Sequence, residues 1–151
     1  MSDRAAELFK ASRESQNRYT YFLLAAAVAA IGYALGQTQG LPLNISQLHL
    51  GIAILCWGVS FFCGCKHIAY INSNLYANME LLRVESGEHP KLRGYGPDGI
   101  AAASEGISLA FDSNSEKASS FANWQFRLLV WGGLFYMAWH LLSMYILSIA
   151  I

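Results

Sequence analysis

The placement of charge constrains this chain more than any other feature of its sequence. No Asp, Glu, Lys or Arg occurs from Tyr19 to Cys65, and none follows Arg127. All ten basic and all ten acidic residues therefore fall in two blocks, Asp3–Arg18 and Lys66–Arg127. A soluble domain carries charged residues over its whole surface, because they are the residues that remain in water. The pattern predicts an all-α, polytopic membrane protein.

Three apolar segments are long enough to cross the hydrocarbon core as helices, which takes about 20 residues. We expect their ends to extend into a cytoplasmic helical bundle. The chain is then a single membrane domain, 1–151, with six segments in order: a cytoplasmic helix (1–18), a first transmembrane helix (19–36), an outer loop (37–47), a second transmembrane helix (48–66), cytoplasmic helices and a loop (67–126), and a third transmembrane helix (127–151).

The first two spans are predicted to continue as helices beyond the membrane. Neither Gly nor Pro occurs between Cys65 and Gly87, and apolar residues there recur at helical steps of three and four. We therefore expect one helix over Leu48–Leu82. The N-terminal block should run straight into the first span, because no helix breaker precedes Gly32.

The segment after the second span is expected to divide into shorter helices. Gly and Pro are frequent in 91–99 (KLRGYGPDG), which predicts a loop. Asp98 is expected to cap a short helix, Ile100–Phe111, whose apolar side would lie on the membrane surface or on other helices. Ser113 and Glu116 have the spacing of a capping box, which predicts that a separate last helix starts there.

The distribution of basic residues predicts the orientation. The outer loop has no Lys or Arg, whereas the N-terminal block has four of them, and Lys66 follows the second span directly. By the positive-inside rule, the N-terminus and Lys66–Arg127 lie in the cytoplasm and the C-terminus lies outside. The expected location is a bacterial inner membrane. Since the net charge is zero, the chain offers no basic field for nucleic acid.

Small residues repeat along one face of each of the first two spans. Such faces let helices approach closely in lipid, and a Gly-x-x-x-Gly pair lies within the first. We expect them to be helix-packing faces, within the chain or between copies. They comprise Ala25, Ala29, Gly32 and Gly36 in the first span and Gly51, Gly58 and Cys65 in the second.

A mildly polar stripe follows the second helix beside the small residues. Polar residues in a span usually face protein or a water-filled path. Two interpretations remain open: tight packing within the chain, or a pore-lining or subunit-facing stripe. In the second case, copies would form a cyclic assembly with a weakly hydrated lumen. The stripe consists of Cys56, Ser60, Cys63, His67, Asn74 and Asn78.

Two groups of residues resemble metal ligands. Cys63 and His67 share a helix face, but Cys65 points elsewhere, so only two ligands converge where a structural zinc site needs four. Met137, His140 and Met144 share one face of the third span, and thioether and imidazole ligands suit Cu(I) or haem iron. His49 and His140 would both lie in the outer half of the bilayer, where two histidines of one chain could ligate a haem. We expect no cofactor, with copper or haem handling through Met137, His140 and Met144 as an alternative.

No nucleophile–base pair, paired-carboxylate motif or Gly-rich phosphate loop occurs, which predicts a non-enzymatic protein. The layout of residues 3–86 is a basic N-terminal helix, a tight span–loop–span hairpin and a long helical extension. It resembles the two-span SLATT-type effector modules of bacterial anti-phage defence. The resemblance implies oligomeric pores triggered by a ligand-sensing partner, and the third span departs from that layout. The whole chain is also similar to small three-span bacterial proteins.

Two functions follow as hypotheses. In the first, the protein forms a homo-oligomer in membrane lipid that acts as a channel or a membrane-perturbing effector. Three helices cannot enclose a wide path alone, so a pore would lie between copies. In the second, the protein is an accessory or adaptor subunit that holds a cytoplasmic or membrane partner.

Overall fold

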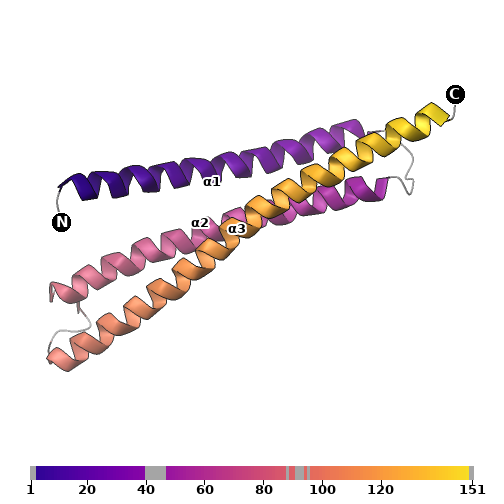
Figure 1. Ribbon diagram of the computed structural model, residues 1–151. Helices are drawn as coiled ribbons and strands as arrows, with labels where there is room; N and C mark the ends of the chain where they lie inside the picture. Colours follow the sequence, from indigo (N-terminus) through magenta and orange to yellow (C-terminus); the bar gives the residue numbers. More distant parts are fainter. Residues whose placement is uncertain (1–2, 40–46, 88, 91–93, 95, 150–151) are drawn as a thin grey trace. The chain divides into compact units, whose positions relative to one another are not determined.

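Three long helices make up the fold. The computed structural model describes residues 3–39, 47–87, 89–90, 94 and 96–149. In these residues the regular elements are α1 (Asp3–Gln37), α2 (Leu48–Glu85) and α3 (Pro97–Ile149), as Figure 1 shows. All three are long and apolar enough to cross a membrane. The predictions of an all-α chain and of three apolar helices of spanning length are confirmed.

The chain divides into two compact units. The first unit contains Met1–Gly64 and Ala122–Ile151, and the second contains Cys65–Phe121. The first unit thus holds α1 with one stretch each of α2 and α3, and the second holds the remaining stretches of α2 and α3.

The helices α1 and α2 are continuous, as their sequences predict. α1 runs without interruption from Asp3 to Gln37, through the change from charged to apolar residues at Tyr19. α2 runs from Leu48 to Glu85 through the corresponding change at Lys66. A local change in polarity does not interrupt a helix, because it leaves the backbone hydrogen bonds intact.

The prediction of two separate helices after residue 97 is wrong. α3 is one helix from Pro97 to Ile149, so Ser113 and Glu116 lie in its interior and open no new helix. Ser115 instead faces α2, where its hydroxyl accepts a hydrogen bond from Asn74. Packing against a neighbouring helix outweighs the local preference of Ser and Asn for helix ends.

The start of α3 also differs from the expectation that Asp98 caps it. Pro97 is the first helical residue, and Asp98 lies within the first turn. The backbone oxygen of Gly96 accepts from the N–H groups of Gly99 (3.0 Å) and Ile100 (3.3 Å). Pro suits a first helical position because its missing N–H would have no partner there, and the acidic Asp98 suits the positive end of the helix dipole.

Gly87 terminates α2. Its φ of 71° lies in the left-handed region, which residues with a Cβ rarely adopt. The N–H groups of Ser86 and Gly87 donate to the oxygens of Leu82 (2.9 Å) and Val84 (3.1 Å), which closes the last turn. Beyond it, His89 Nε2 lies 3.2 Å from Glu80 Oε2. Residues 40–46 of the predicted outer loop, and Glu88, 91–93 and Tyr95 of the next loop, lie outside the described residues.

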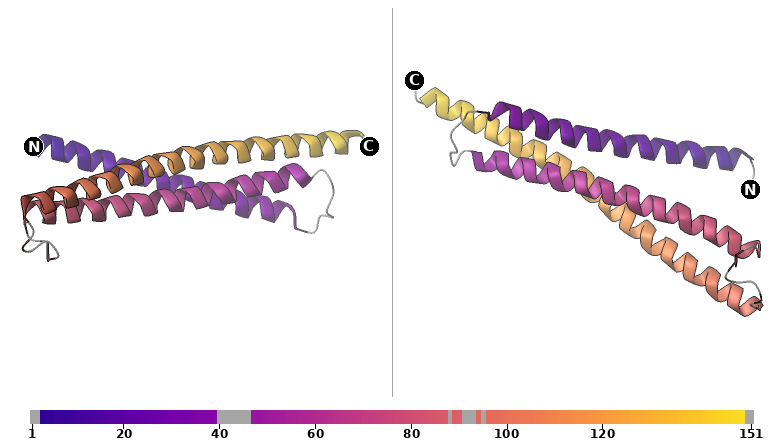
Figure 2. Two further views of the ribbon diagram at one scale, coloured as in Figure 1. Left: turned by 90° about the horizontal axis from the view of Figure 1, so that it is seen from below. Right: turned by 180° about the vertical axis from the view of Figure 1, so that it is seen from behind.

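All three helices contribute to the core of the first unit. Its buried cluster joins one residue of α1, three of α2 and one of α3: Ala34, Leu50, Ala53, Trp57 and Trp139. Tyr136 extends this cluster, because its ring lies 5.8 Å from the Trp57 ring and 5.5 Å from the Trp139 ring. The contact of Trp57 with Tyr136 thus joins α2 to α3. Figure 2 shows the course of the three helices from two further sides.

Candidate functional site

The small-residue faces lie on the surface of the chain. All of the residues predicted to form them are exposed: Ala25, Ala29, Gly32, Gly36, Gly51, Gly58 and Cys65. A Cβ added at Gly32, Gly36, Gly51 or Gly58 would meet no other atom within 4 Å. Among the described residues, these four glycines therefore make no close contact with another helix. Their predicted use between copies stays a prediction.

Close helix contact in the first unit occurs at two other glycines. A Cβ at Gly64 would lie 2.7 Å from Leu24 Cδ2 and 2.8 Å from Gln125 Cδ, so this position joins all three helices. A Cβ at Gly132 would lie 2.9 Å from Cε2 of Trp57. The sequence analysis missed both glycines, because neither belongs to a repeated small-residue pattern. Each is required by a large side chain on a neighbouring helix.

The part of the polar stripe in the first unit faces α3. Ser60 is fully buried, and its hydroxyl donates to the backbone oxygen of Gln125 (2.7 Å). Trp57 Nε1 donates to the oxygen of Leu129 (3.2 Å). Cys63 is buried with a free thiol, and Cys56 is half-buried. These bonds fix α2 against α3, because each side-chain donor reaches a carbonyl on the other helix.

Gln125 is a polar residue of this interface that sequence reasoning missed. Its side chain is 1% exposed, and its Nε2 has no hydrogen-bond partner among the described residues. A buried amide donor without a partner costs about 1–3 kcal/mol. The available signal was the position of Gln125 just before the charge-free end of the chain, where a polar side chain is expected to face protein.

In the second unit the stripe also faces α3. Nδ1 of His67 donates to the backbone oxygen of Ala118 (2.8 Å), and Nδ2 of Asn74 donates to Ser115 Oγ (2.8 Å). Tyr70, between them on α2, stacks on Phe121 with ring centroids 5.7 Å apart. Asn78 is exposed. Among the stripe residues, Ser60, His67 and Asn74 thus carry hydrogen bonds within the chain, as the packing interpretation expects.

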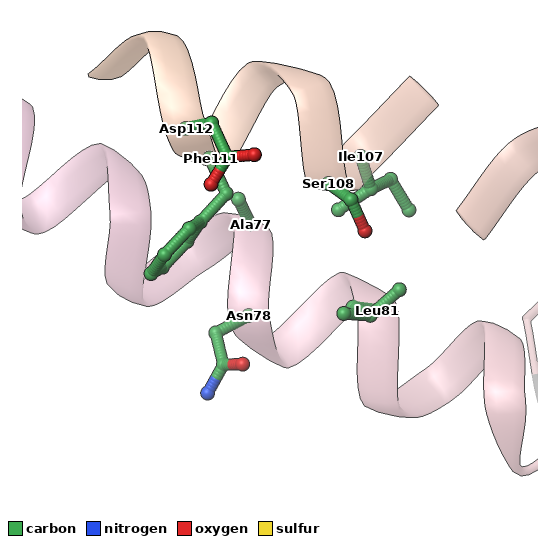
Figure 3. Close-up of a pocket in the computed structure, with 7 residues that line it drawn as sticks. All are labelled: Ala77, Asn78, Leu81, Ile107, Ser108, Phe111 and Asp112. Atoms are coloured by element: carbon green, nitrogen blue, oxygen red, sulfur yellow. The ribbon is translucent and has the colours of Figure 1, made fainter. Parts of the chain in front are cut away.

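The second unit has a cleft between its two helices, and Asn78 lies on its rim. The cleft holds about 190 Å³, and Figure 3 shows the ring of Phe111 reaching from α3 toward α2 within it. Leu81 and Ile107 add apolar surface, whereas Asn78 and Asp112 bring an amide and a carboxylate. Both of these polar residues are exposed. The cleft can accept an apolar group together with a hydrogen-bond donor or a cation.

The possible copper or haem ligands lie on an exposed face of α3. Met137 and Met144 are 54% and 58% exposed, and His140 is exposed with its ring 6.3 Å from that of Trp139. The described residues contain no group of three or more His, Cys, Asp or Glu side chains placed to hold a metal ion. Ligation by Met137, His140 and Met144 stays a prediction. His49 is half-buried, and its Nδ1 has no partner among the described residues.

Comparison with protein-family models, with curated proteins and with solved structures finds no match to this chain.

Proposed function

We propose that the chain is an integral protein of a bacterial inner membrane, with its N-terminus in the cytoplasm. The first unit exposes large apolar side chains on every helix: Phe22 on α1, Leu55 on α2 and Leu141 on α3 are 67%, 69% and 67% exposed. In water, large exposed apolar side chains on all three helices would drive aggregation, whereas lipid solvates them. The absence of Lys and Arg from the loop between α1 and α2 supports the orientation.

Within the membrane, the protein self-associates and acts without enzymatic chemistry, as a channel or a membrane-perturbing effector. One observation carries this proposal. The glycines of the faces on α1 and α2 have open space above them, although such faces serve close helix contact in lipid. A second copy can fill that space and gain the van der Waals contact that the single chain leaves unused. Copies in one membrane share the bilayer normal, which favours a cyclic assembly.

The polar stripe is a poor candidate for the lumen of that assembly. Ser60, His67 and Asn74 bond to α3, so lining a pore would require α2 and α3 to separate and these bonds to break. We therefore favour an assembly that disturbs the bilayer around or between copies. The SLATT-like layout supports the same class of function, with a partner as the trigger.

Purified protein in mild detergent tests self-association by native mass spectrometry, and ion flux through liposomes tests its consequence. Gly58→Leu should reduce the oligomer to monomer and abolish flux. Val59→Leu is the matched control, because it also adds bulk to an exposed position next in the helix and should leave both unchanged. A wild-type protein that stays monomeric at every concentration, with no flux, refutes the proposal.

The cleft of the second unit favours an adaptor as a second candidate. Its mixture of Phe111, Leu81 and Asp112 fits an apolar side chain followed by a basic one, as a protein partner would present. Ala77→Trp would fill the cleft. An adaptor should then lose a partner that copurifies with the wild type in fixed ratio, while its oligomeric state stays the same. Recovery of the pure homo-oligomer from wild-type cells argues against an adaptor.

A further inference from the structure

The hydrogen bonds of the first unit fix the level of Arg127 along α2. Ser60 bonds to the oxygen of Gln125, and Trp57 bonds to that of Leu129. Arg127 lies midway between these acceptors on α3, so it is level with the α2 residues between Trp57 and Ser60. No charged residue occurs in α2 from Leu48 to Gly64. Arg127 is therefore level with the middle of an apolar stretch, at least about 8 Å from the level of Gly64.

At its C-terminal end, α3 extends beyond the level at which α2 begins. By the same register, Leu48 is level with residues close to 137 of α3, and α3 continues to Ile149, more than about 15 Å further. Figure 2 shows α3 passing the ends of α1 and α2. Met144 and Leu147 there are 58% and 67% exposed. In the first unit, the apolar segment of α3 is thus shifted along the axis relative to that of α2, toward the C-terminal end of α3.

The surroundings of Arg127 are those of a membrane–water interface. Arg127 is exposed, and its helix face carries Trp124 three residues before it and Trp131 four residues after it, 52% and 55% exposed. The guanidinium carbon lies 5.8 Å from the centre of the Trp124 ring. Tryptophan is enriched at the level of lipid headgroups. The level that Trp124 and Arg127 mark on α3 is therefore also the level of the apolar middle of α2.

The first unit has no carboxylate near the level of Arg127. Among the described residues Arg127 forms no ion pair, and in the first unit Asp and Glu occur only at Asp3, Glu7 and Glu14. Leu24 and Gln125 both approach Gly64, which makes Glu14 about 18 Å distant from the level of Arg127 along the axis. Parallel copies share this separation. A guanidinium at the depth of apolar, lipid-facing side chains needs an anion, and the lipid phosphate is the anion present around every copy.

We propose that Arg127, held by Trp124, binds the phosphate of a phospholipid and draws that headgroup toward the middle of the bilayer on the α3 side. The guanidinium matches the geometry of a phosphate with two hydrogen bonds, and local thinning of the bilayer lowers the cost of a charge at this depth. The inference rests on the proposed membrane insertion and gives the membrane-perturbing function a mechanism: each copy thins the cytoplasmic leaflet beside α3.

Solid-state NMR tests the contact directly. The protein, labelled at its arginine guanidinium carbons, is placed in vesicles of phosphatidylcholine and phosphatidylglycerol in phosphate-free buffer, so that lipid is the only source of phosphorus. Nearby phosphorus should dephase the signals of those guanidinium carbons that lie close to lipid phosphate. One of these dephased signals should be absent from the spectrum of Arg127→Gln. Arg83→Gln is the control, because Arg83 pairs with Glu80 (3.0 Å), and it should remove no such signal. Helical content by circular dichroism verifies that both variants fold.

The outcomes separate this proposal from the one on which it rests. If the wild type leaves the vesicles in an alkaline wash, membrane insertion is wrong and both proposals fall. If it stays and Arg127→Gln leaves the dephasing unchanged, the phosphate contact alone is overturned. The same holds if Arg127→Gln releases a protein that copurifies with the wild type, since Arg127 then pairs with a carboxylate of a partner.

Discussion

The indole of Trp57 on α2 lies directly against Gly132 on α3, and its Nε1 donates to the backbone oxygen of Leu129 (3.2 Å). The hydrogen bond requires the indole to reach across to α3, and the missing side chain at residue 132 gives it the room to do so. One contact thus sets both the distance and the register of the two helices in the first unit.

Gly132→Ala should destabilise the first unit by about 1–3 kcal/mol, because the added methyl group forces the buried, rigid indole away from α3. Gly133→Ala is the matched control, since a Cβ there meets nothing within 4 Å. It should be neutral or stabilising by up to about 1 kcal/mol through helix propensity. Unfolding by sodium dodecyl sulfate in mixed micelles measures both. Equal effects of the two substitutions would show that Trp57 does not lie against Gly132.

The pair Asn74 and Ser115 should show a favourable coupling. Asn74 is 5% exposed and donates to Ser115 Oγ, so each alanine substitution removes the same hydrogen bond. In the double-mutant cycle of Asn74→Ala and Ser115→Ala, we expect a coupling free energy of about 0.5–1.5 kcal/mol. Thermal unfolding in detergent supplies the four stabilities. Additive effects would mean that the two side chains do not interact.

The proposed orientation predicts which positions react with a membrane-impermeant thiol reagent. Single cysteines at exposed positions, Gln39→Cys and Arg83→Cys, are placed in a variant in which Cys56, Cys63 and Cys65 are replaced. In intact cells, Gln39→Cys should react from outside, whereas Arg83→Cys should react only after lysis. The reverse pattern would overturn the orientation inferred from the basic residues.

The helices of this fold can be predicted from the sequence, but only some of the contacts between them can. Charge placement and the absence of breakers suffice for α1 and α2, because helix formation depends on local residues. The continuity of α3 through Ser113 and Glu116 was missed, since Ser115 is held by a distant partner, Asn74. Helical spacing also identified Ser60 and His67 as one face. It could not choose between a pore and α3 as their partner, because a periodic pattern defines a face and not its neighbour.

The same limit applies to the glycines. The repeat containing Gly32 and Gly36 was visible as a pattern, and both prove exposed. The contacts at Gly64 and Gly132 were not visible, since they depend on side chains of other helices: Leu24 and Gln125 at Gly64, and Trp57 at Gly132. A repeat within one helix therefore does not by itself locate the close contacts between helices in the first unit.

Gln125 gives the sharpest test of the three-helix contact in the first unit. Its side chain is buried beside Gly64, and Nε2 has no acceptor among the described residues. Its bond to Ser60 uses the backbone oxygen, which a side-chain substitution leaves in place. Gln125→Met keeps the length of the side chain and removes the unpaired donor, so it should be neutral or stabilising by up to about 2 kcal/mol. Gln125→Glu keeps the shape but buries a carboxyl group.

A buried carboxylate without a partner is strongly unfavourable, so Gln125→Glu should destabilise the first unit by at least about 2 kcal/mol at neutral pH. The cost should shrink as the pH falls, because protonation removes the charge that cannot be solvated. Unfolding in mixed micelles at neutral and acidic pH measures the two variants against the wild type. If Gln125→Met proves as harmful as Gln125→Glu, the amide has a polar partner and the contact at Gly64 is built differently.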